Sequence, residues 1–532
     1  MARILVVEPV AQAGVDVLAA AHETQVRTGM SRDALLAALA KDGGWDALVV
    51  RSQTRVDAEL LAAAAPRLSV VGVASVGTDR IELEAATRAG VMVVNAPTGN
   101  TIAAAEHSMA LMLALLRRIP AADASVRAGE WDRARYTGAE LRHRTLGIIG
   151  LGRIGKAVAR RASGFEMRVL AHDPFLTAEQ ASEHGARMVG LLELLQRADV
   201  VTVHTPLTAQ TRGLIGEAQI GAMKPGAVLV NVARGGIVDE AAVASALREG
   251  RLAGAAVDVY STEPMAPDNP LRDAPNTVLT PHLGASTSEA QDRVAVEMAE
   301  QLLEALSGVT PPYAVNAPAV APDVAPRLRP YVELGRRLAI LARQLTPAAF
   351  NSIALTYAGE IAAWDCSPIR TAVLAGVLEP VTDQRVNAVN ADLVARERGF
   401  TVHETLTDAS EPWSSLVTLT AGEEPALVLA GSTAHGRPHL AGLSGFDIDA
   451  ELGGLMLVTR HHDQPGIVGA VGVALAEAGV NISSLELSRL SAQGQAMMLV
   501  SVDSPLPPAV LDALRRVPGI HQALVVELPP LD

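Results

Sequence analysis

The feature that most constrains the fold is a set of three spaced glycines between a predicted strand and a predicted helix. The segment Gly150-Leu151-Gly152-Arg153-Ile154-Gly155 follows the apolar run Leu146–Ile149 and opens the helical pattern Lys156–Ala162. Glycines at this spacing allow a tight turn, close approach of a pyrophosphate and close packing of the helix on the strand, while N–H groups at the helix start face the phosphates. The segment therefore predicts a dinucleotide-binding βαβ unit.

A carboxylate after the next predicted strand indicates which dinucleotide binds. Asp173 follows the strand Met167–Ala171. It lies about 20 residues beyond the glycines, where a carboxylate accepts a hydrogen bond from the ribose 2′-OH. Because the same charge repels a 2′-phosphate, NAD is expected in preference to NADP. A plain strand-to-helix turn with Asp173 as the N-cap is the alternative.

Short apolar runs alternate with helical patterns on both sides of the glycines, which indicates βαβ units and parallel sheets. Before the glycines, the predicted strands are Arg3–Val7, Leu48–Val50, Ser69–Val73 and Val91–Val94, and a long helix is predicted over Thr101–Arg118, ended by Pro120. The second set of strands is Leu146–Ile149, Met167–Ala171, Val200–Val203, Ala227–Val232, Ala255–Val259 and Thr277–Leu279. The expected fold class is α/β, with two Rossmann-like, doubly wound units.

The chain continues well beyond these two units. Residues 311–330 contain six prolines and predict a semi-rigid linker, followed by a helix over Pro330–Leu345. A mixed α+β region follows, with strand candidates Ser352–Thr356, Leu416–Thr420 and Ala426–Leu429. The last segment has the ferredoxin-like βαββαβ order. Its elements are Leu455–Arg460, Gly466–Ala478, Ile482–Arg489, Ala496–Val502, Pro508–Arg515 and Gln522–Glu527.

Composition sets the scale and excludes several classes. The chain has 532 residues, 49% of them apolar, enough for roughly three or four domains with buried cores. The net charge of −14 argues against nucleic-acid binding. The one cysteine, Cys366, excludes an intrachain disulfide and a cysteine-based metal site, and no metal is expected. No apolar run approaches the ~18 residues of a membrane span, so we expect a soluble protein without a membrane partner, and the single cysteine is consistent with a reducing, cytoplasmic location.

Three further motifs lie where predicted strands end, the edge at which open α/β sheets bind ligands. They are Asn231–Gly235, Asp258 through Pro264, and Pro281–Ala285. Oxidation of an alcohol requires a base for the hydroxyl proton, a carboxylate that orients the base, and a cation for an acidic substrate. His282, Glu263 and Arg234 supply these three parts, although each alone has an ordinary structural explanation.

With these motifs, residues 1 to about 312 resemble the D-2-hydroxyacid dehydrogenase family. The resemblance implies Arg234, Glu263 and His282 as the catalytic residues, and Asp258 as a contact of the nicotinamide carboxamide. It also implies a split substrate domain, 1–97 with 286–312, around an NAD domain over 98–285. The implied cofactor contacts are Gly150, Gly152, Arg153, Ile154, Gly155, Asp173, Thr205, Pro206, Val232, Ala233, Arg234, Asp258, His282, Gly284 and Ala285.

Within that family, the segment Arg51–Thr54 is similar to the substrate loop of phosphoglycerate dehydrogenases. An arginine and a hydroxyl suit a phosphate or a carboxylate, although a surface loop is the alternative. The implied substrate contacts are Arg51, Ser52, Val76, Gly77, Asn100, Arg234 and His282. Val73-Ala74-Ser75 departs from many relatives, which have an arginine and a glycine there. Trp131 either packs in a core or reaches a neighbouring subunit.

The tail resembles that of long-form phosphoglycerate dehydrogenases. Residues 320–451, with Val386–Ala391 as a marker, resemble the intervening domain, and 453–532 resemble an ACT domain. The resemblance implies that L-serine binds at His461, Asp463 and Asn481, between paired ACT domains of a homotetramer, and inhibits the enzyme. Capping of helix and strand ends by Asp463 and Asn481 is the alternative.

The resemblance implies NAD-dependent oxidation of 3-phospho-D-glycerate to 3-phosphooxypyruvate, with a 2-oxoglutarate reductase side activity left open. Two other functions also remain open at this stage. One is a glyoxylate or hydroxypyruvate reductase of the same family. The other is an NAD-sensing, corepressor-like binding protein, against which the two-domain tail and the lack of a basic patch argue.

Overall fold

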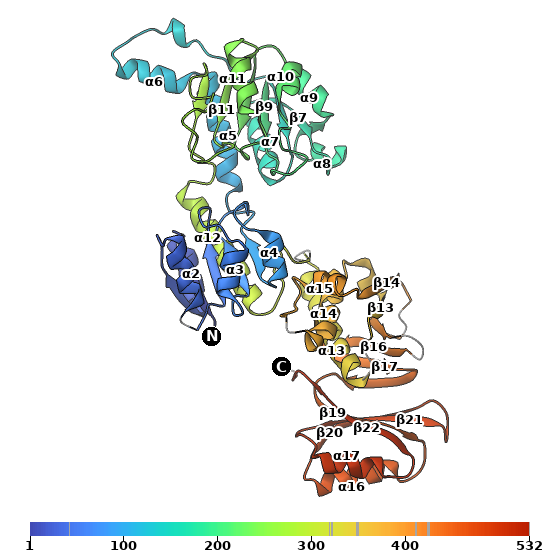
Figure 1. The fold of residues 1–532 in the computed structure, drawn as a ribbon. Helices are drawn as coiled ribbons and strands as arrows, with labels where there is room; N and C mark the ends of the chain where they lie inside the picture. The colour runs from blue at the N-terminus through green and yellow to red at the C-terminus, as the bar shows by residue number, and fades with distance from the viewer. Residues whose placement is uncertain are drawn as a thin grey trace.

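The computed structural model describes residues 1–530 except 42, 319, 321–322, 347–349, 383, 410–411 and 423–425. These residues form four sheets, each at the centre of a separate body. Figure 1 shows the four bodies in a row, with the second body at the top, the N-terminal body beneath it, and the third and fourth bodies below. The α/β fold class predicted from the sequence is confirmed.

The N-terminal body is a parallel five-stranded sheet in the order β2-β1-β3-β4-β5. Its strands are β1 (Arg3–Val6), β2 (Glu23–Val26), β3 (Ala47–Val50), β4 (Val70–Val73) and β5 (Met92–Asn95). Its helices are α1 (Gln12–Ala21), α2 (Arg32–Ala40), α3 (Ala58–Ala64), α4 (Leu83–Arg88) and, returning from much later in the chain, α12 (Ser288–Leu306). Because α12 packs on α1 and β4, this body is assembled from two distant segments.

The second body is a parallel seven-stranded sheet in the order β12-β11-β10-β9-β6-β7-β8. Its strands are β6 (Thr145–Ile149), β7 (Arg168–His172), β8 (Ala186–Met188), β9 (Val200–Val203), β10 (Ala227–Asn231), β11 (Leu252–Val257) and β12 (Thr277–Leu279). Its helices are α7 (Arg153–Gly164), α8 (Ala178–Ser182), α9 (Leu191–Arg197), α10 (Glu217–Ala222) and α11 (Glu240–Arg248). Strand order reverses between β6 and β9, which places a ligand crevice at their carboxyl ends.

Two strands of these first two sheets were not predicted from the sequence, and both lie at sheet edges. β2 is polar and largely exposed, and β8 has only three residues. An edge strand buries less surface than a central one, so neither shows the apolar run that marked the other strands.

The helix predicted over Thr101–Arg118 is shorter, and Pro120 does not end it. α5 covers Thr101–Leu116, and Arg118 adopts a left-handed conformation with φ of 54°. Pro120 then lies in the first turn of α6 (Ile119–Arg127), where proline is tolerated because no helical partner needs its missing N–H. Figure 1 shows α6 projecting from the second body.

The proline-rich stretch is partly anchored rather than a free spacer. The N–H of Val315 donates to the carbonyl of Val93 at 2.7 Å, and Asn316 Oδ1 accepts from Val93 N–H at 2.8 Å, so this segment extends the β5 edge. The next helix, α13 (Ala325–Leu345), begins five residues before the predicted start and contains Pro330.

The third body is a six-stranded mixed sheet in the order β14-β13-β15-β16-β17-β18, covered by helices. Its strands are β13 (Ser352–Gly359), β14 (Thr401–Thr407), β15 (Ser415–Ala421), β16 (Leu427–Ala434), β17 (Arg437–Leu443) and β18 (Phe446–Glu451). Besides α13, its helices are α14 (Ser367–Leu378) and α15 (Ala391–Glu397). Cys366 is buried.

The fourth body has the predicted ferredoxin-like order. Its elements are β19 (Gly454–His462), α16 (Ile467–Glu477), β20 (Ile482–Arg489), β21 (Gln495–Val502), α17 (Pro508–Arg515) and β22 (Ile520–Leu528). One face of its antiparallel sheet joins the core of the third body through Met456, Leu499 and Val526. The third and fourth bodies therefore share one apolar core. Among the described residues, no helix has the length and apolar character that crossing a bilayer requires.

Candidate active site

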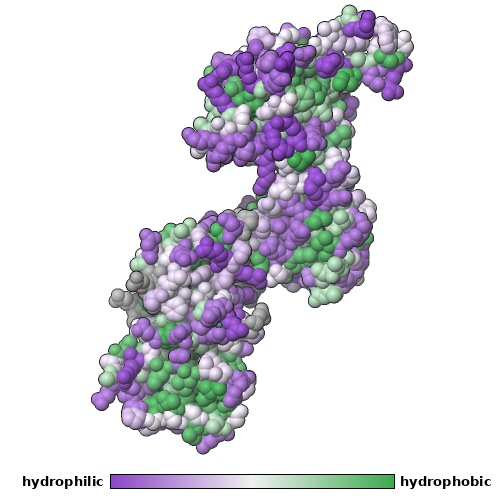
Figure 2. All heavy atoms as spheres, turned by 180° about the vertical axis from the view of Figure 1, so that it is seen from behind, coloured by the Kyte–Doolittle hydropathy of each residue, from purple (hydrophilic) through white to green (hydrophobic). Residues whose placement is uncertain are grey.

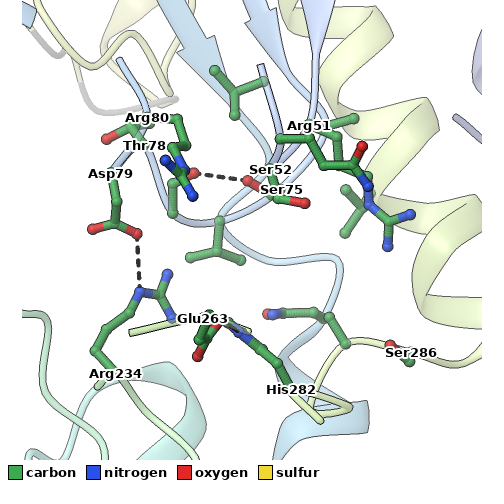
Figure 3. A pocket seen from close by; sticks show the side chains of 18 of the residues that line it. Arg51, Ser52, Ser75, Thr78, Asp79, Arg80, Arg234, Glu263, His282 and Ser286 are labelled. Atoms are coloured by element: carbon green, nitrogen blue, oxygen red, sulfur yellow. Dashed lines mark hydrogen bonds and ion pairs between the residues drawn. The ribbon is translucent and has the colours of Figure 1, made fainter. Parts of the chain in front are cut away.

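A cleft of about 1100 Å³ lies between the N-terminal and second bodies. Figure 2 shows the molecule hollowed at the narrow join between its two upper bodies. In Figure 3, Arg234, Glu263 and His282 of the second body face Arg51, Ser52 and Thr78 of the N-terminal body. The structure thus brings together residues that are up to 231 positions apart (51 to 282).

The glycine segment forms the turn that the sequence predicted, between β6 and α7. Gly150 has φ of 91°, and a Cβ there would lie 2.7 Å from the carbonyl of His204. A Cβ on Gly155 would lie 2.2 Å from the carbonyl of Gly150, so α7 can approach the strand only with glycine at this position. Nothing lies within 4 Å of the Cβ position of Gly152, which caps α7. That open side leaves room for a pyrophosphate at the helix start.

Asp173 lies beside this turn, just beyond the end of β7. One carboxylate oxygen accepts from Leu151 N–H at 2.9 Å and the other from Phe175 N–H at 2.9 Å. Among the described residues, none hydrogen-bonds the buried Oγ1 of Thr205, which follows β9 at the same edge. A carboxylate after β7 and an unpartnered hydroxyl after β9, on either side of β6, fit a dinucleotide with a free ribose 2′-OH.

His282 and Glu263 form a pair at the cleft. His282 Nδ1 lies 2.7 Å from Glu263 Oε2, and the two side chains are 47% and 36% exposed. The hydrogen bond that His282 donates to Glu263 raises the pKa of His282, burial opposes this, and the Glu263 and Asp258 charges reinforce it. Since Nδ1–H donates to the carboxylate, Nε2 is left with a free lone pair, as a base requires.

Asp258 holds the turn that carries His282. Its side chain is fully buried, Oδ1 accepts from Leu283 N–H at 2.7 Å and Oδ2 from Gly284 N–H at 2.9 Å. Thr280 Oγ1 donates to Oδ1 at 2.6 Å, and His107 Nε2 lies 3.2 Å from it. Both oxygens thus serve protein groups, and the implied contact of Asp258 with the nicotinamide stays a prediction.

Arg234 reaches from the second body to the N-terminal body. Its Nε donates to Asp79 Oδ2 at 3.2 Å and its Nη1 to the carbonyl of Ala233 at 2.8 Å. A Cβ on Gly77 would lie 2.3 Å from Arg234 Nη2, so the guanidinium can lie on this loop only because residue 77 is glycine. Arg234 therefore already binds one carboxylate inside the cleft.

The other predicted substrate residues line the same cleft. Arg51 and Ser52 follow β3, and Val76 and Gly77 follow β4. Asn95 Nδ2 donates to the carbonyl of Val76 at 2.7 Å and fixes this loop to β5. Asn100 lies at the start of α5, and among the described residues none hydrogen-bonds its buried Oδ1. A buried, unpartnered acceptor that lines a cleft fits a ligand with a donor group.

The remaining predicted cofactor residues lie around the turn at the carboxyl ends of the strands. Val232 and Ala233 are buried directly after β10, and a Cβ on Gly284 would lie 3.1 Å from Val232. Ala285 lines the cleft. Ile154 is in the first turn of α7, and Pro206 follows Thr205. The Arg153 guanidinium lies over the ring of Tyr313 at 5.8 Å, so it also contacts the start of the linker.

Comparison with known proteins shows the family to which the chain belongs. Family models match residues 109–284 as the NAD-binding domain of D-isomer specific 2-hydroxyacid dehydrogenases, 327–440 as the D-3-phosphoglycerate dehydrogenase intervening domain, and 455–519 as an ACT domain. The D-3-phosphoglycerate dehydrogenase of Archaeoglobus fulgidus is 40% identical over 99% of this chain and all of its own length. That of Synechocystis is 39% identical over 99% of this chain and 95% of its own.

The chain belongs to the D-3-phosphoglycerate dehydrogenase family.

Solved structures match the first two bodies. The TT0316 protein of Thermus thermophilus is 38% identical, with a TM-score of 0.54 over 59% of this chain and 99% of its own. An NAD-dependent formate dehydrogenase of Staphylococcus aureus in complex with NAD is 29% identical, with a TM-score of 0.51 over 57% of this chain and 96% of its own. The predicted enzyme class and the NAD cofactor are confirmed, and the second body is the NAD-binding domain.

The ACT domain separates two of the implied serine residues within one chain. Asn481 precedes β20 and donates to Asp503 Oδ2 at 2.6 Å. Asp463 pairs at 2.8 Å with Arg489, at the other end of β20. Eight strand residues correspond to roughly 25 Å, so His461 and Asp463 cannot hold one serine together with Asn481 of the same chain. His461 is 3% exposed beside Thr459.

Three polar residues that contact the site residues were not predicted from the sequence. Asp79 binds Arg234, His107 contacts Asp258, and Glu8 accepts hydrogen bonds from the Arg51–Thr54 loop. A signal for Glu8 was available, because it directly follows the first predicted strand, at the edge where ligands bind. Asp79 and His107 lie in a loop and inside a helix, where no sequence pattern marks them.

Proposed function

We propose that this chain oxidises 3-phospho-D-glycerate to 3-phosphooxypyruvate, the first step of phosphorylated L-serine biosynthesis. The observation that carries the proposal is the His282–Glu263 pair at 2.7 Å, in a cleft whose opposite wall presents Arg51 and Ser52. NAD, when bound, supplies the acceptor for the hydride that leaves C2 of the substrate.

His282 accepts the proton in this reaction. The substrate 2-hydroxyl proton passes to Nε2 while the C2 hydrogen leaves as hydride, so that the C2–O bond becomes a carbonyl. Glu263 then faces an imidazolium, and its charge stabilises that cation. In the reverse direction, the protonated His282 returns the proton to the carbonyl oxygen.

Two arginines orient the substrate from opposite walls of the cleft. Arg234 binds the substrate carboxylate in the place where it now binds that of Asp79. Arg51 and Ser52 bind the phosphate at the other end of the molecule. A substrate held at both ends keeps C2 aligned for reaction, and an unphosphorylated acid loses one of the two contacts.

The test is NAD reduction by the purified protein with 3-phospho-D-glycerate. Arg51→Ala should raise KM for this substrate, and KM for NAD should stay the same. Higher activity on glyoxylate or hydroxypyruvate would assign the chain to the alternative reductases, and activity with 2-oxoglutarate would establish the side reaction. If the protein binds NAD but turns over none of these acids, the result would support the NAD-sensing, corepressor-like function.

We further propose that L-serine inhibits the enzyme at a site made by two ACT domains. Since β20 is an edge strand, antiparallel pairing of two copies of β20 would bring Asn481 of one chain to His461 and Asp463 of the other. Leu487 and Leu490 near this edge are 46% and 55% exposed, and Figure 2 shows a large apolar area on the lowest body. Both observations support a partner chain at this domain.

A second exposed apolar region supports the tetramer. Trp131 is 81% exposed, so the core alternative for this residue is wrong. Ile119 and Val126 on α6 are 53% and 57% exposed. Contacts at both α6 and the ACT domain would link four chains. Sedimentation of the full chain tests this proposal. A dimer in solution would show that one of the two proposed contacts does not form.

The contacts between domains offer a route from the ACT domain to the substrate loop. Asn387, in the Val386–Ala391 marker, donates from Nδ2 to the carbonyl of Gly90 at 2.7 Å. Gly90 precedes β5, and Asn95 at the end of β5 holds Val76 in the cleft. Serine can act through this route only if it binds one arrangement of these domains better than another.

Serine titration by calorimetry and by initial rate tests this regulation. Asn481→Ala should remove both binding and inhibition. Asn387→Ala should keep binding and lose most of the inhibition, since it removes the contact with Gly90 and otherwise only a local hydrogen bond from Val389 N–H. Inhibition by serine that survives Asn481→Ala would mean that serine acts elsewhere.

A further inference from the structure

A buried carboxylate lies behind the loop that faces the phosphate end of the cleft. Glu8 lies two residues beyond the end of β1 and is only 4% exposed. Its Oε2 accepts from Ser52 N–H at 3.0 Å and from Gln53 N–H at 3.0 Å, and its Oε1 accepts from Thr54 N–H at 2.8 Å. Three consecutive backbone donors thus converge on one side chain.

These hydrogen bonds are of the strong, charge-assisted kind. Burial alone would raise the pKa of Glu8. The N–H groups of Thr54, Arg51, Ser52 and Gln53 outweigh burial, so that the pKa is lowered and the group is ionised at neutral pH. A buried carboxylate is retained only where donors replace its lost hydration, and here the donors are the backbone of one loop.

The contact determines how the loop can meet a ligand. Because the N–H groups of Ser52, Gln53 and Thr54 face Glu8, they cannot serve an anion in the cleft. The side chains must do so, and Arg51, Ser52 and Gln53 line the cleft. Figure 3 shows Arg51 and Ser52 on the N-terminal wall, across from His282. Glu8 itself does not line the cleft.

We propose that Glu8 is a positioning residue for substrate binding, and that its charge holds the Arg51–Thr54 loop in the conformation that presents Arg51 and Ser52 to the substrate phosphate. This inference rests on the proposed function, in which these two side chains bind the phosphate. Glu8 acts through the loop and touches neither the substrate nor the cofactor.

Glutamine is the informative replacement. The amide of Glu8→Gln has one acceptor oxygen, and its NH2 group would face at least one backbone N–H of the loop. The loop then loses one or two of its three anchors, while side-chain volume is kept. Glu8→Asp retains the charge with one methylene fewer and should keep part of the anchoring.

Asp46 provides a matched control in the same sheet, at the amino ends of the strands. It precedes β3, its side chain is 23% exposed, and it accepts from Arg3 N–H at 2.7 Å and from Arg67 Nε at 2.9 Å. Asp46→Asn also disturbs a partly buried carboxylate that binds backbone, but it lies at the amino ends of the strands, away from the cleft.

The experiment measures kcat, KM for 3-phospho-D-glycerate, KM for NAD and the melting temperature of the full-length variants. Glu8→Gln should raise KM for the phosphorylated acid about tenfold, the scale of one lost hydrogen bond to a charged group. Its kcat should change less than about threefold and its KM for NAD should not change. Glu8→Asp should have a smaller effect, and Asp46→Asn should lower the melting temperature without raising either KM.

Three results would overturn the inference. The first is an unchanged KM for 3-phospho-D-glycerate in Glu8→Gln while Arg51→Ala raises that KM. The proposed phosphate site would then stand, but Glu8 would have no role in it. The second is a larger defect in Glu8→Asp than in Glu8→Gln, because charge would then not be the cause. The third is an equal rise in KM for NAD, which indicates general disorder. If Arg51→Ala leaves KM for 3-phospho-D-glycerate unchanged, the proposed phosphate site is itself refuted, and with it the role of Glu8.

Discussion

Arg337 joins the intervening and ACT domains and offers a sharp test of how they are held together. It lies on α13, is only 4% exposed, and its Nη1 donates to the carbonyls of Leu452 at 2.8 Å and Pro529 at 2.5 Å. Its Nη2 donates to the carbonyl of Pro530 at 3.0 Å. Since Leu452 precedes β19 and Pro529 follows β22, one guanidinium binds both ends of the ACT domain.

Arg337→Met should destabilise this unit by a few kcal/mol. Methionine keeps the apolar stem but removes the donor to the Leu452 carbonyl and leaves the Pro529 carbonyl with only Gly454 N–H, at 3.3 Å, at a cost of roughly 1–3 kcal/mol for each lost hydrogen bond. Removal of the buried charge offsets part of this cost, so the free energy of unfolding should fall by about 3 kcal/mol. For a unit of about 200 residues, that free energy corresponds to a fall in melting temperature of roughly 6–12 °C.

Scanning calorimetry of the full chain measures the effect. The transition of the C-terminal unit should move down, while the NAD-domain transition and kcat stay unchanged, because Arg337 lies outside the cleft. Arg336→Met is the matched control: Arg336 is the preceding residue, its side chain is 49% exposed, and it pairs with Glu379 at 3.4 Å. An exposed pair contributes at most about 1 kcal/mol. An equal fall in the melting temperature of the C-terminal unit in both variants would refute the assigned role of Arg337.

Three further outcomes concern the chemistry. His282→Ala should lower kcat by roughly 10²–10⁴-fold with NAD affinity unchanged by fluorescence titration; an active variant would exclude His282 as the base. Glu263 raises the pKa of His282 above its usual 6.5, so oxidation, which needs neutral His282, should increase as pH rises through that pKa, and reduction should decrease. Glu263→Gln should move both pH profiles toward lower pH, and profiles that do not move would contradict the pairing. Asp173→Ala should reduce the ratio of kcat/KM for NAD to that for NADP, whereas an unchanged ratio would separate Asp173 from the ribose.

Local chemistry could be predicted along the chain. The Gly150 turn, the parallel strands and the βαββαβ order of the tail each depend on residues close in sequence, where backbone conformation and hydrophobic period act directly. His282 and Glu263 were predictable for the same reason, since each follows a strand and strand ends meet at one edge. The edge strands β2 and β8 were not, because they bury too little apolar surface to leave a pattern.

Other features arise only from contacts between distant segments. The sequence marked Arg234 as a carboxylate ligand, but packing of the N-terminal body against the NAD domain brings it to Asp79, 155 residues away. The match to ACT domains grouped Asp463 with Asn481, and the length of β20 separates them within one chain. Glu8 and the Arg51 loop meet because β1 and β3 are neighbours in the sheet. Sequence determined which groups the chain carries and the local turns that hold them. Tertiary structure decided which groups meet, because a hydrogen bond or ion pair needs contact within a few ångströms and chain separation alone does not set that distance.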